Sequence, residues 1–287
     1  MRDGVDFTRI DTHQHFWKYS AAEYPWICTD MSALARDFLP RDLAETIRPA
    51  GIDAVVSVQA RQNLEETEWL LQLASENDFI AGVVGWVPLI DARVEDHLDR
   101  FAQHPKLKGV RHVLQDESDD DYILRPDFNA GIEKLSGYGL VYDVLIFERH
   151  LPQTMEFVDR HPNQVFVLDH VAKPRIKDCI LSPWREHITE LAKRQNVWCK
   201  ISGMVTEADW RNWTPADLSP YFEIVLAAFS PSRLMFGSDW PVMLVAADYQ
   251  RWYRTVLDAL AKLSSAEQAE ILGGVAMRVY NLDLQMG

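Results

Sequence analysis

The sequence predicts an α/β protein that forms a closed (β/α)8 barrel of the TIM type, and three observations support this prediction. Eight short apolar runs alternate with segments of helical periodicity along the chain. The length of 287 residues is close to the roughly 250 residues typical of such barrels. No glycine-rich phosphate-binding loop follows the first apolar run, which argues against an open, doubly wound sheet. No linker or internal repeat divides the chain, so we expect a single domain over residues 1–287.

The eight apolar runs are rich in Val, Ile and aromatic residues, as the buried strands of a parallel sheet should be. Their starts fall roughly 25–45 residues apart, which is enough for a strand, a crossover helix and two loops. In chain order, the predicted strands are residues 9–16, 53–59, 80–87, 107–114, 139–146, 164–169, 197–202 and 233–238.

The segments between these runs have the spacing of amphipathic helices. Residues 64–77, 91–103 and 248–263 each gather apolar side chains near one face and leave charged side chains on the other. The connection over residues 17–38 is long for a barrel of this kind. We expect it to lie over one end of the barrel as a lid.

The formal net charge of −14, from 43 acidic and 29 basic residues, argues against partners with anionic surfaces. Nucleic-acid backbones and anionic membranes would both be repelled. The three cysteines form no paired motif and fit reduced thiols better than a disulfide framework. The sequence shows neither the apolar segment of a secretory signal nor a run of about eighteen apolar residues. We therefore expect a cytoplasmic protein that binds neither nucleic acid nor membranes.

His13 and His15 form a His-x-His pair at the end of the first predicted strand. Because side chains alternate along a strand, both imidazoles point to the same side of the sheet, one strand repeat apart. Such a pair can hold one metal ion, or it can present two hydrogen-bond donors to one carbonyl group. The alternative is a pair of structural histidines beside a strand end, and the pair alone does not decide between the two.

His170 and Asp239 follow the sixth and eighth predicted strands, at the end of the barrel where active sites lie. Taken singly, His170 is more often a loop histidine, and Asp239 could simply cap a turn. In a closed barrel, however, the eighth strand lies beside the first, which brings Asp239 next to the histidine pair. A carboxylate there can bind a metal or accept a proton from an attacking water. The candidate metal ligands are therefore His13, His15, His170 and Asp239.

Three segments resemble the amidohydrolase superfamily, namely residues 11–15 (DTHQH), 168–174 (LDHVAKP) and 236–241 (FGSDWP). Within it, the chain is most similar to the lactonase branch, which includes L-fuconolactonase-like, L-rhamnonolactonase-like and 2-pyrone-4,6-dicarboxylate lactonase-like enzymes. Each motif is moderately specific by itself. Together they are a strong signal, because the resemblance extends in order over nearly the whole chain.

The resemblance implies an amidohydrolase-like barrel that opens a small lactone, with L-fucono-, L-rhamnono- or L-galactonolactone as the expected sugar lactones, to its aldonic acid. By position, the three histidines match the family's site histidines and Asp239 matches its acid after the last strand. Our mechanistic hypothesis makes Asp239 the general base for the attacking water, with His15 and His170 as further catalytic residues. The branch contains metal-bound and metal-independent enzymes, so the expected cofactor is one divalent metal, zinc in the first place, or none. A homodimer is also plausible.

Six residues near strand ends are candidates for binding this substrate. Arg111 offers a planar fork for a carboxylate or several hydroxyl groups, unless it is an ordinary surface arginine. Alternation turns the neighbouring His112 to the opposite side of the strand, and Gln59 at the end of the second strand is a weaker candidate of the same kind. Aromatic residues could stack on a sugar face, and those near strand ends are Trp17, Trp86 and Trp240.

Two other functions compete with lactone hydrolysis. The same scaffold supports metal-dependent decarboxylases and amide hydrolases. A non-catalytic sugar-binding barrel is less favoured, because all four candidate site residues are chemically competent. No unrelated catalytic motif is present, since the chain has no Gly-x-Ser-x-Gly elbow, no His-Glu-x-x-His and no Walker sequence.

Overall fold

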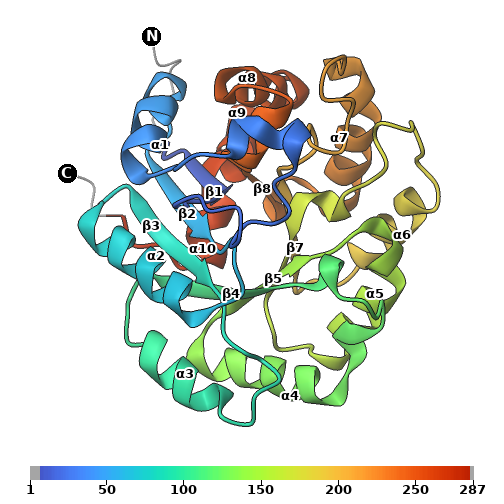
Figure 1. Cartoon of the computed structure of the whole chain (residues 1–287). Coiled ribbons are helices and arrows are strands. Elements are labelled where there is room, and N and C mark those ends of the chain that lie inside the picture. Colours follow the sequence, from blue (N-terminus) through green and yellow to red (C-terminus); the bar gives the residue numbers. More distant parts are fainter. Residues whose placement is uncertain (1–6, 285–287) are drawn as a thin grey trace.

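The structure is a computed structural model that describes residues 7–284. Its eight strands form one parallel sheet in the order in which they occur in the chain. The sheet closes on itself, because Gln14 in the first strand pairs with Trp240 after the last. The amide of Asp239 also donates a hydrogen bond to the carbonyl oxygen of His13 at 2.7 Å. Eight parallel strands with helices outside them confirm the predicted (β/α)8 barrel (Figure 1).

Each strand falls within the range predicted for it, and the strands are β1 (Ile10–Gln14), β2 (Ala54–Val58), β3 (Ile80–Gly85), β4 (Leu107–Val113), β5 (Val141–Leu145), β6 (Phe166–Leu168), β7 (Val197–Ile201) and β8 (Leu234–Phe236). The helices are α1 (Pro40–Ile47), α2 (Leu64–Glu76), α3 (Val94–Phe101), α4 (Pro126–Leu135), α5 (Leu151–Arg160), α6 (Trp184–Leu191), α7 (Pro215–Phe229), α8 (Tyr249–Leu260), α9 (Ser265–Ala269) and α10 (Val275–Val279). Among the residues described, no helix combines the length and apolar character that crossing a membrane requires.

An apolar cluster fills one end of the barrel interior. It includes the first residues of β1, β2 and β5, which are Ile10, Ala54 and Val141. Val275 of α10 and the following Tyr280 pack into the same cluster. The C-terminal segment therefore closes the barrel at the amino ends of its strands. The carboxyl ends remain free to carry a site, as is usual in this fold.

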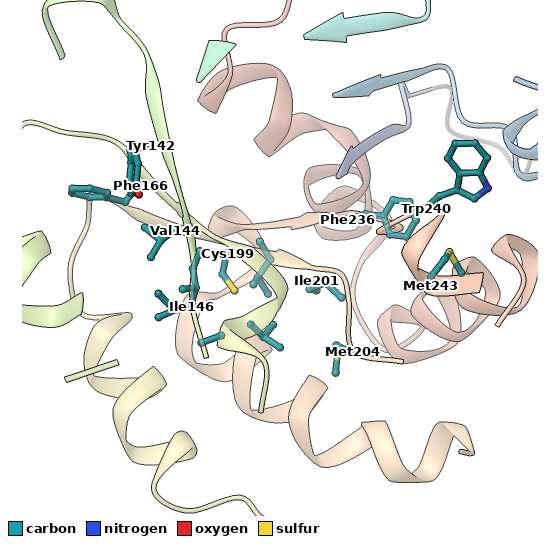
Figure 2. Packing of buried hydrophobic residues seen from close by; sticks show 14 of the residues in the cluster. Tyr142, Val144, Ile146, Phe166, Cys199, Ile201, Met204, Phe236, Trp240 and Met243 are labelled. Atoms are coloured by element: carbon teal, nitrogen blue, oxygen red, sulfur yellow. The ribbon is translucent and has the colours of Figure 1, made fainter. Parts of the chain in front are cut away.

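A second apolar layer packs the outer face of the strands against the surrounding helices. Figure 2 shows its part around β5 to β8, with Val144, Phe166 and Cys199 among the buried side chains. Cys199 is free within this layer, and Cys28 and Cys179 are exposed and unpaired. The three cysteines are thus thiols in the structure, as the sequence predicts.

The long connection over residues 17–38 is tied down at both of its ends. The amide of Trp17 donates to the carbonyl oxygen of Phe38 at 3.0 Å, and the reverse bond measures 2.9 Å. Between these ends, Glu23 and Trp26 contribute to the lining of a cavity at the carboxyl ends of the strands, as does Trp17. The connection therefore lies over that end of the barrel, where a lid is expected.

Candidate active site

The closure of the barrel brings the four predicted site residues together. His13 and His15 come from the end of β1, His170 follows β6 and Asp239 follows β8. All four side chains are buried, with exposures between 0% and 4%. Backbone hydrogen bonds join β1 to the segment after β8 here. The amide of His15 donates to the carbonyl oxygen of Trp240 at 2.7 Å, in addition to the bond from the Asp239 amide to His13.

One carboxylate oxygen faces all three imidazoles. Oδ1 of Asp239 lies 3.4 Å from Nε2 of His15, 3.8 Å from Nε2 of His13 and 3.9 Å from Nε2 of His170. The Nε2 atoms of His13 and His15 are 3.2 Å apart, so the pair points to the same side as alternation requires. The three Nε2 atoms thus surround one carboxylate oxygen.

The opposite nitrogen of each imidazole has its own partner, which holds the ring in place. Nδ1 of His15 donates to the carbonyl oxygen of Val58 at 2.8 Å. Since a carbonyl oxygen only accepts, Nδ1 carries the proton and Nε2 of the neutral ring is a free acceptor. Nδ1 of His170 lies 2.9 Å from Oγ of Ser202, and Nδ1 of His13 lies 3.2 Å from Oδ1 of Asp169. Such outer contacts are typical of metal-binding histidines.

Burial determines the charges of these groups. It lowers the pKa of His170 to about 4 and lowers the pKa of His13 well below its ordinary value. Burial by itself would raise the pKa of Asp239, but the nearby imidazoles of His170, His15 and His13 outweigh that effect and hold the pKa low. At neutral pH the site therefore presents unprotonated imidazole nitrogens around an ionised carboxylate.

This donor set fits a divalent transition metal such as zinc. Neutral imidazole and carboxylate are zinc ligands in both structural and catalytic sites. His13, His170 and Asp239 each offer one ligand atom, and these atoms lie within 4.8 Å of one another. His15 is not part of this group of three, but its Nε2 lies 3.2 Å from Nε2 of His13 and 3.4 Å from Oδ1 of Asp239.

Arg111 on β4 is fixed beside this cluster. Its Nη1 lies 3.3 Å from Nε2 of His13 and donates to Oδ2 of Asp169 at 3.0 Å. Its Nη2 donates to the backbone oxygen of Gln59 and to Oε1 of the same residue at 3.1 Å. Its buried Nε has no hydrogen-bond partner in the described part of the chain. The guanidinium is thus held rigidly while one donor stays free.

A buried ion network underlies the histidines, and sequence reasoning missed it. Lys200 of β7 extends its Nζ to Oδ2 of Asp143 at 2.5 Å, to Oδ1 of Asp169 at 3.1 Å and to Nδ1 of His13 at 3.3 Å. The hydroxyl of Tyr280 donates to Oδ1 of Asp143 at 2.8 Å. A charged residue inside an otherwise apolar strand, as in VYDVL and VWCKI, is the signal that could have revealed it.

A cavity of about 640 Å³ opens onto the cluster. Of the predicted residues, His15, Trp17, Arg111, His170 and Asp239 line it. The lining also includes residues that the sequence analysis did not name as site candidates, among them Glu23, Trp26, Arg61, Asn63, Phe147, Lys173, Glu207 and Trp210. Lys173 lies in the segment 168–174 (LDHVAKP) that carries the family resemblance. The other residues lie in no such motif, so spacing alone gives no signal for them.

The remaining substrate candidates do not line this cavity. Nε1 of Trp86 donates to Nδ1 of His112 at 3.3 Å, and the His112 ring stacks on Tyr122, with the ring centroids 5.2 Å apart. His112 therefore faces away from the barrel interior, as alternation predicts. Trp240 packs edge-on against Phe38, with the ring centroids 5.1 Å apart, and Figure 2 shows it among the buried apolar side chains. Gln59 acts on the site indirectly, because its Oε1 accepts a hydrogen bond from Nη2 of Arg111.

Comparisons with known proteins agree with this geometry. Residues 10–282 match the amidohydrolase family. The L-fucono-1,5-lactonase of Burkholderia multivorans is 44% identical, with 96% of each chain covered. The L-fucono-1,5-lactonase of Burkholderia ambifaria is 37% identical, with 97% of each chain covered. A crystal structure of a Burkholderia multivorans amidohydrolase with bound zinc superposes with a TM-score of 0.93 at 44% identity, over 96% of this chain and 100% of that one. This chain therefore belongs to the amidohydrolase family.

Proposed function

We propose that this protein is a lactonase that hydrolyses a sugar lactone to its aldonic acid. The observation that carries the proposal is the convergence of three imidazole nitrogens on the carboxylate of Asp239 at the floor of a cavity of sugar size. The names of the relatives support the substrate class, since two are L-fucono-1,5-lactonases. A third relative, the L-rhamnono-gamma-lactonase of Scheffersomyces stipitis, is 24% identical over 68% of this chain.

One divalent ion, most simply zinc, would be held by the side chains of His13, His15, His170 and Asp239. When bound there, it would polarise the lactone carbonyl and increase the acidity of water. The chain itself fixes the ligand geometry through Val58, Ser202 and Asp169, whose contacts orient the three rings.

Asp239 serves as the general base in this proposal. Its carboxylate accepts a proton from the water whose oxygen attacks the lactone carbonyl carbon. The ring carbon–oxygen bond then breaks, and the proton passes to the leaving alkoxide, which yields the hydroxy acid. His15 and His170 border the same point and keep Asp239 oriented. With a pKa far below 7, Asp239 is in its basic form throughout the neutral range.

Arg111 lines the cavity and binds a substrate oxygen through its guanidinium group in this proposal. Gln59 contributes by holding the guanidinium. Trp17 gives the cavity an aromatic wall. The other three candidates, Trp86, His112 and Trp240, do not line this cavity, and the proposal gives them no direct contact with substrate. We retain from the sequence the proposal of a cytoplasmic homodimer that forms one domain.

A panel of lactones with a pH indicator tests the proposed function. We expect acid release from L-fucono-1,5-lactone or a related sugar lactone, with kcat/KM at least tenfold above that for simple carboxylic esters. Release of carbon dioxide from aromatic acids would instead identify a decarboxylase, and turnover of amides would identify an amide hydrolase. A thermal shift with sugar lactones but no turnover would point to a binding protein and contradict the proposal.

Removal of metal is expected to abolish most of the activity. Because three neutral imidazoles and a carboxylate lose their common partner on chelation, hydrolysis should fall in proportion to the zinc content of the protein. Elemental analysis and acid release are measured on the same samples, before chelation and after zinc is added back. Full turnover at metal contents far below one ion per chain would favour the metal-independent form, in which the histidines polarise the carbonyl as hydrogen-bond donors.

A further inference from the structure

Two charged side chains face each other in the cavity beside the candidate catalytic residues. Nζ of Lys173 and Oε1 of Glu207 are 4.0 Å apart, and the two side chains are 17% and 23% exposed. Both line the cavity. This distance is beyond the range of a hydrogen bond. In the described part of the chain neither side chain has another hydrogen-bond partner, and Nζ of Lys173 lies 5.5 Å from the centroid of the Phe147 ring. The protein thus holds a donor and an acceptor close together and leaves both available.

The backbone that carries Lys173 is strained. His170, Val171, Ala172 and Lys173 have φ values of 53°, 49°, 62° and 49°, which places four consecutive residues in the left-handed region. Such a conformation costs about 1–2 kcal/mol for each residue with a side chain. The turn is held by a bond from the Lys173 amide to His170 at 2.8 Å and by one from Nε1 of Trp184 to Val171 at 2.8 Å. Strain of this kind is typical of functional sites.

The turn places two side chains in the same cavity, one at each of its ends. His170 faces Asp239, while Lys173 faces Glu207. Gly203 makes room for the His170 ring, because a Cβ atom at position 203 would lie 2.5 Å from Nδ1 of His170. A histidine could be positioned without three further left-handed residues. The same left-handed turn thus carries both His170 and Lys173 to the cavity.

The gap between Lys173 and Glu207 suits a hydroxyl group. A hydroxyl oxygen at hydrogen-bond distances of about 2.8 Å from each atom would form roughly a right angle between them. It would accept from the ammonium group and donate to the carboxylate. A substrate carboxylate fits this position poorly, because Glu207 already has Asp239 and Glu148 as acidic neighbours.

We propose that Lys173 and Glu207 form a hydroxyl-binding pair that selects polyhydroxylated lactones over unsubstituted ones, an inference that rests on the proposed lactonase function. A site built to bond a hydroxyl discriminates strongly against an analogue that lacks it, because the analogue leaves its charged groups unpaired. The pair lies next to Asp239 and His170, so it fixes the ring relative to the attacking water.

The test compares L-fucono-1,5-lactone with δ-valerolactone, which has the same ring size and no hydroxyl groups. We expect Lys173→Met and Glu207→Gln each to lower the ratio of kcat/KM between these two lactones by about 10–100-fold. In the double variant, this ratio should fall at most about threefold below that of the more impaired single variant, because the two groups act on one hydroxyl. Lys177→Met is the matched control, since this exposed lysine lies on the same loop outside the cavity, and its ratio should not change.

A binding measurement separates failure of this inference from failure of the proposed function. The probe is 1,5-anhydro-L-fucitol, which keeps the ring hydroxyls but has no carbonyl to hydrolyse. Calorimetry should give at least tenfold weaker binding to Lys173→Met and Glu207→Gln than to the unmodified and Lys177→Met proteins. Absence of lactone turnover with this pattern intact would reject only the proposed function. Equal losses on both lactones, or unchanged affinity for the probe, would overturn the hydroxyl-binding pair.

Discussion

Replacement of Asp239 by Asn should lower kcat for lactone hydrolysis by about 10²–10⁴-fold, the usual contribution of a positioned general base. The amide keeps nearly the same shape, but it cannot accept the proton of the attacking water. It also replaces the ionised oxygen that faces the three Nε2 atoms at 3.4–3.9 Å. Acid release from L-fucono-1,5-lactone measures kcat, and elemental analysis of the same sample measures any loss of metal.

Asp258→Asn provides a matched control for this substitution. Asp258 is exposed on α8 and does not line the cavity. The same change of charge there should leave kcat within about twofold of that of the unmodified protein. Retention of near-normal turnover by Asp239→Asn, with an unchanged melting temperature, would remove Asp239 from the role of base. The carboxylate would then serve only to hold the rings.

The sequence predicts the barrel well, because its strands are buried on both faces and therefore read as continuous apolar runs. The observed strands are shorter than the predicted ones where the chain turns sharply. The range 164–169 contains β6 (Phe166–Leu168), and the strand stops there because a turn begins at Asp169 and continues into the left-handed residues from His170 on. The gathering of His13, His15 and Asp239 also follows from closure of the sheet, which places the last strand beside the first.

The network beneath the histidines depends on features that periodicity does not contain. Lys200 and Asp143 are 57 positions apart in sequence and meet only through the register of β5 to β7. The pairing of β1 with β2 shifts register between Asp11 and Gln14, an irregularity that the apolar pattern of the strands does not indicate. Lys173 is placed by a backbone conformation that its residue types disfavour. Such contacts require the three-dimensional structure.

Lys200 is the residue on which this buried network depends. Its ammonium group is fully buried between Asp143 and Asp169. Burial raises the pKa of Asp143 to about 6 although Lys200 acts against that rise. For Asp169, burial is outweighed by Lys200, His13 and Arg111, which hold its pKa well below the ordinary value. Two buried carboxylates thus share one lysine, and each needs the positive charge of Lys200 to stay ionised.

Lys200→Met should therefore lower the free energy of unfolding by about 3–5 kcal/mol, the usual effect of removing one partner from a buried ion pair. Denaturant unfolding measures it, with the exposed Lys262→Met as the control, which should change stability by less than about 0.5 kcal/mol. Asp143→Asn in the Lys200→Met background should recover about 1–3 kcal/mol, because it removes the unpaired charge and keeps an acceptor for Tyr280. A loss below about 1 kcal/mol for Lys200→Met, or strictly additive effects of the two substitutions, would contradict this account. In either case the histidines would be held by their direct contacts alone.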